Sequence, residues 1–141
     1  MENYRLHRGR LIDHIQLVVN NFETSKAFYT VVLSVLEIPV ISTDDDYIWA
    51  DELVVSSVKS PASAGELTGR HHLAFQAKNR EVVDAFYHAA LSHGGRDNGA
   101  PGERSYHPGY YAAFVLDPDG NNIEAVCNGQ LKPDTDLGTL L

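Results

Sequence analysis

The sequence predicts an α+β fold made of two tandem modules, each with the order strand–helix–strand–strand–strand. An internal repeat, the alternation of apolar side chains and a hairpin signal in the second half support this prediction. The modules are expected over residues 11–58 and 71–128, with an N-terminal arm at 1–10, a linker at 59–70 and a C-terminal tail at 129–141. We expect one structural domain: a curved mixed sheet with the helices on its outer face and a concave ligand cleft inside.

The internal repeat has an offset of 58 residues (72 minus 14). Segment 13–34, DHIQLVVNNFETSKAFYTVVLS, aligns without a gap on segment 71–92, HHLAFQAKNREVVDAFYHAALS. The alignment places His14 on His72 and repeats the tripeptide AFY in the same register. A fixed period of this length indicates a tandem duplication.

Each copy opens with a strand in which apolar and polar side chains alternate. In the first copy His14 and Gln16 lie opposite the apolar residues, and in the second copy His72 and Gln76 do the same. Both histidines are therefore expected on the face of the sheet that the apolar residues leave free.

A helix follows each of these strands. Asn21 and Asn79 are suited to accept a hydrogen bond from the first turn as N-caps, and apolar residues recur behind both at helical spacing. Each helix is expected to cover the apolar face of its own sheet.

The remaining strands are shorter. In the first module they are expected within residues 38–43, 47–50 and 53–58. In the second module a loop at 95–109 precedes two strands joined by the turn Asp-Pro-Asp-Gly at 117–120.

Composition limits the classes of partner. The formal net charge of −8 argues against a nucleic-acid backbone or an anionic membrane as partner, and no apolar run has the length of a membrane span. The single cysteine, Cys127, cannot form an internal disulfide, so a reducing, cytoplasmic location is expected.

One carboxylate, Glu124, lies in an otherwise apolar strand. By parity its side chain points with Asn122 to the face that carries His14 and His72. Two imidazoles and a carboxylate suit a divalent ion such as zinc, iron, manganese or nickel, with positions left open for substrate. The alternatives are structural histidines, and a Glu124 that pairs with an arginine or lies exposed near an end of the sheet.

The segment 105–114, SYHPGYYAAF, is the second source of candidates. His107 or Tyr110 could act as acid–base group or hydrogen-bond donor, although a surface loop with an aromatic plug explains the same pattern. Parity does not decide whether Tyr110 or Tyr111 faces inward. Trp49 is either a wall of the cleft or core. The candidate substrate-binding residues are Gln16, Trp49, Gln76, Tyr106 and Tyr111.

The motifs IDHIQLVV, SKAFY, HHLAFQA, VVDAFYHAAL and GYYAAFVLDPDGNNIEAV resemble the vicinal oxygen chelate superfamily. This superfamily includes glyoxalase I, bleomycin-resistance and fosfomycin-resistance proteins and extradiol dioxygenases, and the resemblance covers residues 11 to 128. It implies metal ligands at His14, His72 and Glu124. A fourth ligand position, on the last strand of the first repeat, aligns with Ser56, which is not a carboxylate.

The resemblance implies a small-molecule ligand and a homodimer but no single activity, because one fold hosts many functions. The first hypothesis is a metal-dependent lyase, isomerase or dioxygenase acting on an oxygen-bearing substrate. The second is a metal-free protein that sequesters a small molecule or drug, as bleomycin-resistance proteins do. A paralogue that kept only the fold is a third. Whether the metal site closes within one chain or across two stays open at this point.

Overall fold

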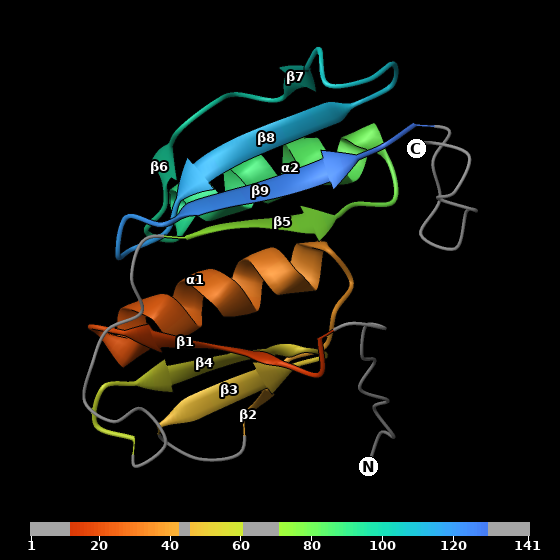
Figure 1. Ribbon diagram of the computed structural model, residues 1–141. Helices are drawn as coiled ribbons and strands as arrows, with labels where there is room; N and C mark the ends of the chain where they lie inside the picture. Colours follow the sequence, from red (N-terminus) through yellow and green to blue (C-terminus); the bar gives the residue numbers. More distant parts are fainter. Residues whose placement is uncertain (1–11, 43–45, 61–70, 130–141) are drawn as a thin grey trace.

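The computed structural model describes residues 12–42, 46–60 and 71–129 (Figure 1). The expected arm at 1–10, most of the expected linker and all but the first residue of the expected tail lie outside these residues. Among the described helices none has the length and apolar character needed to cross a membrane.

The first module forms a four-stranded sheet with the strand order β1-β4-β3-β2. β1 and β4 are parallel, whereas β3 is antiparallel to both of its neighbours. The elements are β1 (Ile15–Val19), α1 (Phe22–Val35), β2 (Ile41–Ser42), β3 (Tyr47–Ala50) and β4 (Leu53–Ser57).

The second module forms a five-stranded sheet with the order β5-β9-β8-β6, and β7 also pairs with β8. Its elements are β5 (His72–Gln76), α2 (Arg80–Ser92), β6 (Arg96–Asp97), β7 (Gly102–Glu103), β8 (Tyr111–Leu116) and β9 (Asn122–Cys127). The two short strands β6 and β7 lie in the segment that we expected to be a loop. Each is held by its pairing with β8, a contact that their own sequence does not announce.

Both predicted helix caps are confirmed. The side-chain oxygen of Asn21 accepts the backbone N–H of Thr24 at 3.1 Å, and that of Asn79 accepts the backbone N–H of Val82 at 2.9 Å. Each cap satisfies a backbone donor that has no partner within its helix, and so fixes where the helix begins.

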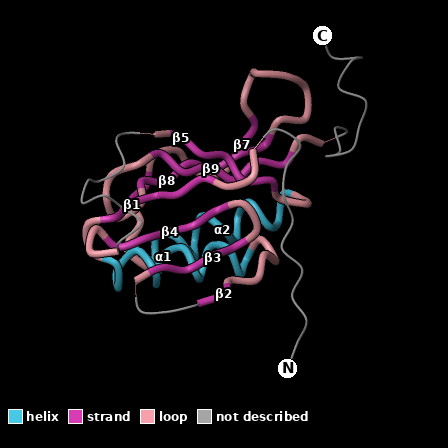
Figure 2. Tube along the Cα trace, turned by 60° about the horizontal axis from the view of Figure 1, so that its bottom comes forward, coloured by secondary structure: helices cyan, strands magenta, loops and turns pink. Residues whose placement is uncertain are grey.

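The two helices lie on one side of the sheets, and the opposite faces of the sheets are left without a helix (Figure 2). The predicted fold class is confirmed. The strands form two sheets within the chain, however, rather than one continuous sheet. One apolar core joins both modules, with Leu17 and Val55 from the first sheet, Val115 and Ile123 from the second, and Phe28 between them on α1.

The edge strands β1 and β5 point in opposite directions. In Figure 1, β1 runs to the left and β5 runs to the right, so the two strands begin at opposite ends of the molecule. His14 directly precedes β1 and His72 is the first residue of β5. The two histidines that the repeat superimposes are therefore at opposite ends of one chain.

A buried carboxylate ties the two modules together. Tyr29, on α1, donates its hydroxyl to Asp117 Oδ2 at 2.5 Å, and Asp117 lies in the turn between β8 and β9. The backbone N–H groups of Asp119 and Asn121 each donate to Asp117 Oδ1 at 2.9 Å. Burial, followed by the charge of Asp117 and the hydrogen bond to it, raises the pKa of Tyr29 well above its ordinary value, so the hydroxyl remains a donor.

Candidate functional site

Glu124 is the centre of a hydrogen-bonded group in the second module. It lies in the middle of β9 and is only 2% exposed. Its Oε1 is 2.7 Å from Nε2 of His72 on β5, and its Oε2 accepts the hydroxyl of Tyr110, one residue before β8. A buried carboxylate needs partners of this kind, because an unpaired charge is costly to remove from water.

Strand register places this group on the side of the sheet away from α2. Glu124 is paired with Ala74 on β5 and with Phe114 on β8. His72 and Ala74 are exposed, whereas Leu73 between them packs against the core. The Phe114 ring meets the His72 ring edge to face at a centroid distance of 5.9 Å. The face that carries Glu124 is therefore open to solvent at His72.

Tyr110 connects Glu124 with an aromatic cluster. The pKa of the Tyr110 hydroxyl is raised above its ordinary value, mainly by burial and next by the hydrogen bond to Glu124. The Tyr110 ring contacts the rings of Tyr106 and His107 at centroid distances of 4.9 and 5.2 Å. Tyr106 is 71% exposed, so this cluster extends from Glu124 to the surface.

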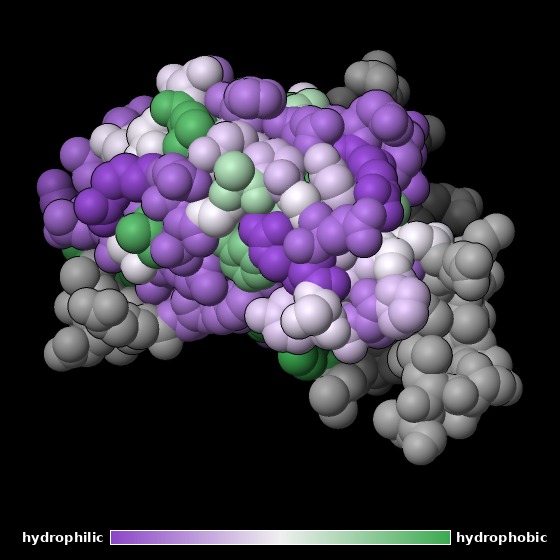
Figure 3. Space-filling view, turned by 90° about the horizontal axis from the view of Figure 1, so that it is seen from above, coloured by the Kyte–Doolittle hydropathy of each residue, from purple (hydrophilic) through white to green (hydrophobic). Residues whose placement is uncertain are grey.

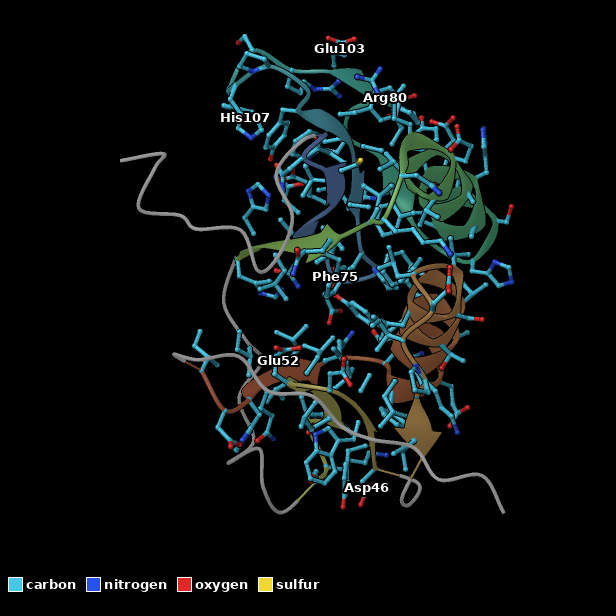
Figure 4. The ribbon with its side chains drawn as sticks, turned by 90° about the vertical axis from the view of Figure 1, so that its right-hand side faces the viewer. Asp46, Glu52, Phe75, Arg80, Glu103 and His107 are labelled. Atoms are coloured by element: carbon cyan, nitrogen blue, oxygen red, sulfur yellow. The ribbon has the colours of Figure 1, made fainter. Side chains whose placement is uncertain are left out.

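His107 is held within the same loop. Its Nε2 lies 3.1 Å from the side-chain oxygen of Asn128, and its Nδ1 lies 3.0 Å from the carbonyl oxygen of Pro108. Figure 4 shows His107 on the side of the second module that lies away from α2. His107 is connected to Glu124 only indirectly: its ring contacts the Tyr110 ring, and the Tyr110 hydroxyl bonds to Glu124.

His14 does not join this group. Its side chain is 52% exposed, and its Nδ1 is 2.7 Å from a carboxylate oxygen of the neighbouring Asp13. Across residues 12–42, 46–60 and 71–129, no group of three or more His, Cys, Asp or Glu side chains is arranged to hold a metal ion. Two of the three predicted ligands, His72 and Glu124, meet in one chain; the third lies on the other module.

The first sheet carries a polar pair in place of a carboxylate. Gln16 Nε2 donates to Ser56 Oγ at 3.0 Å across β1 and β4. Strand pairing sets Val54 opposite Gln16, as it sets Glu124 opposite Ala74 in the second sheet. The counterpart of Glu124 is therefore Val54, two residues before the Ser56 that we expected, and neither residue can supply a carboxylate.

Two aromatic candidates occupy opposite positions. Trp49 alternates with the buried Ile48 and Ala50, so its ring lies on the face without a helix, and its indole N–H donates to the Asp51 carbonyl at 3.0 Å. Tyr111 donates its hydroxyl to Asp84 of α2 at 2.7 Å. Tyr111, named above as a candidate substrate-binding residue, therefore faces the helix, and Tyr110 belongs to the inward set, a choice that the sequence had left open.

Comparison with known families identifies the fold that carries this site. The family model described as the Glyoxalase/Bleomycin resistance protein/Dioxygenase superfamily matches residues 11–125. The chain belongs to this superfamily. The resemblance seen in the sequence motifs is thus confirmed, and it extends over both modules.

Solved structures of the superfamily have the same architecture. A glyoxalase/bleomycin resistance protein from Albidiferax ferrireducens T118 is 28% identical, with a TM-score of 0.66 over 83% of this chain and 98% of its own. A lactoylglutathione lyase from Agrobacterium tumefaciens is 16% identical, with a TM-score of 0.60 over 84% of this chain and 94% of its own. At that identity the second likeness shows the fold alone. No curated protein matches the chain.

A separate pocket of 380 Å³ lies at the junction of the two modules of this superfamily member. Phe75 and Glu52 contribute to it from opposite modules (Figure 4), and Gln76 lines it as well. Apolar residues complete the wall, among them Ile15 of β1, Leu33 of α1 and Leu36 directly after α1. Neither His72 nor Glu124 lines this pocket.

Sequence reasoning missed two neighbours of His72. Phe114 contacts its ring, and the Asn122 side-chain nitrogen lies 3.5 Å from His72 Nδ1. Asn122 was assigned to the correct face, but its role depends on the pairing of β5 with β9. Pairing of strands more than 40 residues apart could not be deduced from the local pattern.

Proposed function

We propose that this chain is a metal-dependent enzyme of the superfamily that acts on a small oxygen-bearing substrate by lyase, isomerase or dioxygenase chemistry. The observation that supports it most is the 2.7 Å contact between Nε2 of His72 and Oε1 of Glu124. An imidazole nitrogen and a carboxylate oxygen this close can serve one divalent ion. The donor set thus fits zinc, iron, manganese or nickel, and the described residues of the chain place no third ligand beside it.

The missing ligand is assigned to His14 of a second copy of the chain. His14 is half exposed and stands at the end of the molecule opposite to the start of β5. β1 and β5 are edge strands of their sheets, and such edges favour pairing with another chain. A two-fold homodimer would bring β1 of each copy to the second module of the other and form two equal sites.

The chain's own residues supply the rest of the site. A metal bound there would act as a Lewis acid toward neighbouring oxygens of the substrate. Asn122 limits the rotation of the His72 ring, and the Tyr110 hydroxyl donates a hydrogen bond to the second oxygen of Glu124. Tyr106 and Phe114 offer apolar surface on either side, which would exclude water from a bound substrate.

A mixing experiment tests the shared site. His14→Ala and His72→Ala proteins, each purified alone, are expected to bind almost no Mn²⁺ or Ni²⁺. When the two are unfolded together and refolded, half of the dimers are mixed, and each mixed dimer contains one intact site. Metal binding should therefore return to about a quarter of the wild-type level, measured by elemental analysis after gel filtration.

A matched control is His93→Ala, at the C-terminal end of α2 and away from Glu124, which should bind as much metal as the wild type. Full loss in both single variants with no recovery on mixing would contradict a site shared by two copies. Absence of a stoichiometric metal in wild-type protein after reconstitution would contradict the metal-dependent function itself.

The pocket at the module junction supports a second candidate, metal-free binding of a small organic cation. Glu52 lines it, and its carboxylate forms no hydrogen bond or ion pair with the described residues. Among the described residues that line it, none is a lysine, arginine or histidine. This function predicts that hydrophobic cations raise the melting temperature in the presence of EDTA and that Glu52→Gln removes the effect. Asp51 lines the pocket as well, so a shift that survives both Glu52→Gln and Asp51→Asn would place the ligand elsewhere.

Localisation in the cytoplasm remains a prediction from the single cysteine.

A further inference from the structure

Arg104 follows β7 and lies beside the proposed site. Its backbone N–H donates to the carbonyl of Tyr110 at 2.9 Å. Tyr110 is the residue whose hydroxyl bonds to Glu124. The backbone at position 104 is thus held against that of Tyr110, within the segment that the sequence predicted to be a loop.

The loop also holds the guanidinium group in one place. Nη2 donates to the Ala100 carbonyl at 2.8 Å, and Nη1 donates to the carbonyl of Glu103 at 3.3 Å. Two glycines leave room for it: a Cβ added at Gly102 would lie 3.1 Å from Nη1, and one added at Gly99 would lie 3.3 Å from Nη2. Larger residues at either position would displace the group.

The charge lies on the same side of the sheet as Glu124. Cζ of Arg104 is 5.3 Å from the centroid of the Phe114 ring, a cation–π distance. The same ring contacts His72, and Phe114 is the strand partner of Glu124. Although burial and Glu124 raise the pKa of Tyr110 overall, the Arg104 charge acts in the opposite direction, as expected of a neighbouring cation.

Arg104 has no carboxylate partner among the described residues, in a chain of net charge −8. Arg80 provides the contrast. It stacks on Tyr111, on the opposite face of β8, and pairs with Glu103 at 3.3 Å (Figure 4). A guanidinium presents several N–H donors, and the two carbonyl contacts leave others of Arg104 unused. Such a group matches the geometry of a carboxylate or phosphoryl oxyanion.

We propose that Arg104 binds an oxyanion group of the substrate, so that the substrate of the site at Glu124 is a small anion. This inference rests on the proposed function for the location of the reacting group, but the anion contact itself needs no metal. The surface seen above β7 and β8 is mainly hydrophilic (Figure 3), as expected where a polar, charged ligand enters. Arg104 determines specificity in this proposal; it is not assigned a step in the reaction.

The test titrates EDTA-treated protein with methylphosphonate, acetate and the neutral acetamide. Binding is followed by NMR through the Arg104 side-chain Nε–H and the His72 ring. We expect saturable binding of at least one of the two anions and none of acetamide. Arg104→Gln should weaken anion binding at least about ten-fold. Whichever anion binds more tightly distinguishes a phosphoryl group from a carboxylate.

Arg80→Gln is the matched control, since it removes a stacked arginine from the other face of the same strand. It should change anion affinity by less than about two-fold. Gly102→Ala is a second variant that keeps every charge but crowds Nη1, and it should also weaken anion binding. Far-UV circular dichroism checks that each variant is folded.

Three results would overturn the inference. The first is equal anion affinity of the wild type and Arg104→Gln, and the second is an equal loss of anion affinity in Arg104→Gln and Arg80→Gln. The third is the absence of saturable anion binding by the wild type. Because EDTA removes metal, these outcomes are independent of the metal-binding experiments. If the protein binds metal but its anion affinity does not depend on Arg104, only the proposed anion contact is refuted. One that binds anions through Arg104 but takes up no metal refutes the enzyme proposal alone.

Discussion

Asp117 shows how one side chain can fix the relation between distant segments. Its carboxylate is 1% exposed and is held by donors from its own turn and by the hydroxyl of Tyr29, which is 88 residues earlier. The Asp-Pro-Asp-Gly turn is therefore more than a connection between β8 and β9. It anchors the strand that carries Glu124 to the helix of the first module.

Tyr29→Phe removes only the donor of this contact. We expect the free energy of unfolding to fall by about 1–3 kcal/mol, because the buried Asp117 oxygen loses a charge-assisted hydrogen bond. Urea unfolding followed by circular dichroism measures the loss. Tyr87→Phe is the control: its hydroxyl bonds to the exposed Asp97 at 2.9 Å, so its removal should cost much less. Similar losses in both variants would contradict the role of Asp117.

For single residues, the sequence predicted the face of the sheet on which a side chain lies better than it predicted the hydrogen-bond partner of that side chain. Alternation along β9 placed Glu124 with His72, and the structure joins them. The same reasoning could not choose between Tyr110 and Tyr111, because each belongs to a clean alternating set. The choice is made by Asp84 on α2, which accepts the Tyr111 hydroxyl, a contact between separate elements.

At the scale of elements, the caps explain why both helices begin where they do. Asn21 and Asn79 occupy the same place in the two repeats, and each accepts a backbone N–H from the first turn. A side-chain oxygen three residues before its donor is a purely local feature. It was therefore predictable, whereas the two-residue strands β6 and β7 depend on a distant partner and were not.

Replacing either cap with alanine should destabilise the protein by about 1 kcal/mol. The double variant Asn21→Ala/Asn79→Ala should lose about the sum, since the two caps share no partner. Thermal and urea denaturation provide the measurement. Asn20→Ala, next to the first cap but without its hydrogen bond, is expected to change stability by less than about 0.5 kcal/mol. If the loss of stability in the double variant differs strongly from the sum of the two single losses, the two caps are energetically coupled.

At the scale of the whole molecule, the two modules share one core. Phe28, Tyr29 and Val32 of α1 are fully buried and belong to the same apolar cluster as Val83 and Phe86 of α2. Separation of the modules would expose these side chains and break the hydrogen bond between Tyr29 and Asp117. The repeat is therefore expected to fold as one unit, despite its duplicated sequence.

Calorimetry should show a single unfolding transition whose calorimetric and van't Hoff enthalpies agree. The shared core is the reason, because neither module can bury its apolar face alone. Two resolved transitions would show that the modules are thermodynamically independent. Calorimetry of Lys78→Ala is the control for surface charge, because Lys78 forms an ion pair with Glu37 of the other module and both side chains are exposed. If the shared core, and not this ion pair, couples the modules, Lys78→Ala should still unfold in a single transition.

The arrangement of the modules was the least predictable level. The repeat register superimposes His14 on His72, and it suggested that the two imidazoles point at one location. Superposition of sequence says nothing about the symmetry that relates the copies in space. In the structure the copies run in opposite directions, which separates residues that occupy the same place in the repeat (Figure 1).

If the metal site is shared between two copies, as proposed, these opposed directions have a consequence for any assay of the protein. A centre that takes ligands from two chains exists only while the chains are associated, so its occupancy follows mass action. Serial dilution would release the ion even though each chain keeps its fold. Specific activity would then depend on enzyme concentration, and a very dilute sample could be inactive without being damaged.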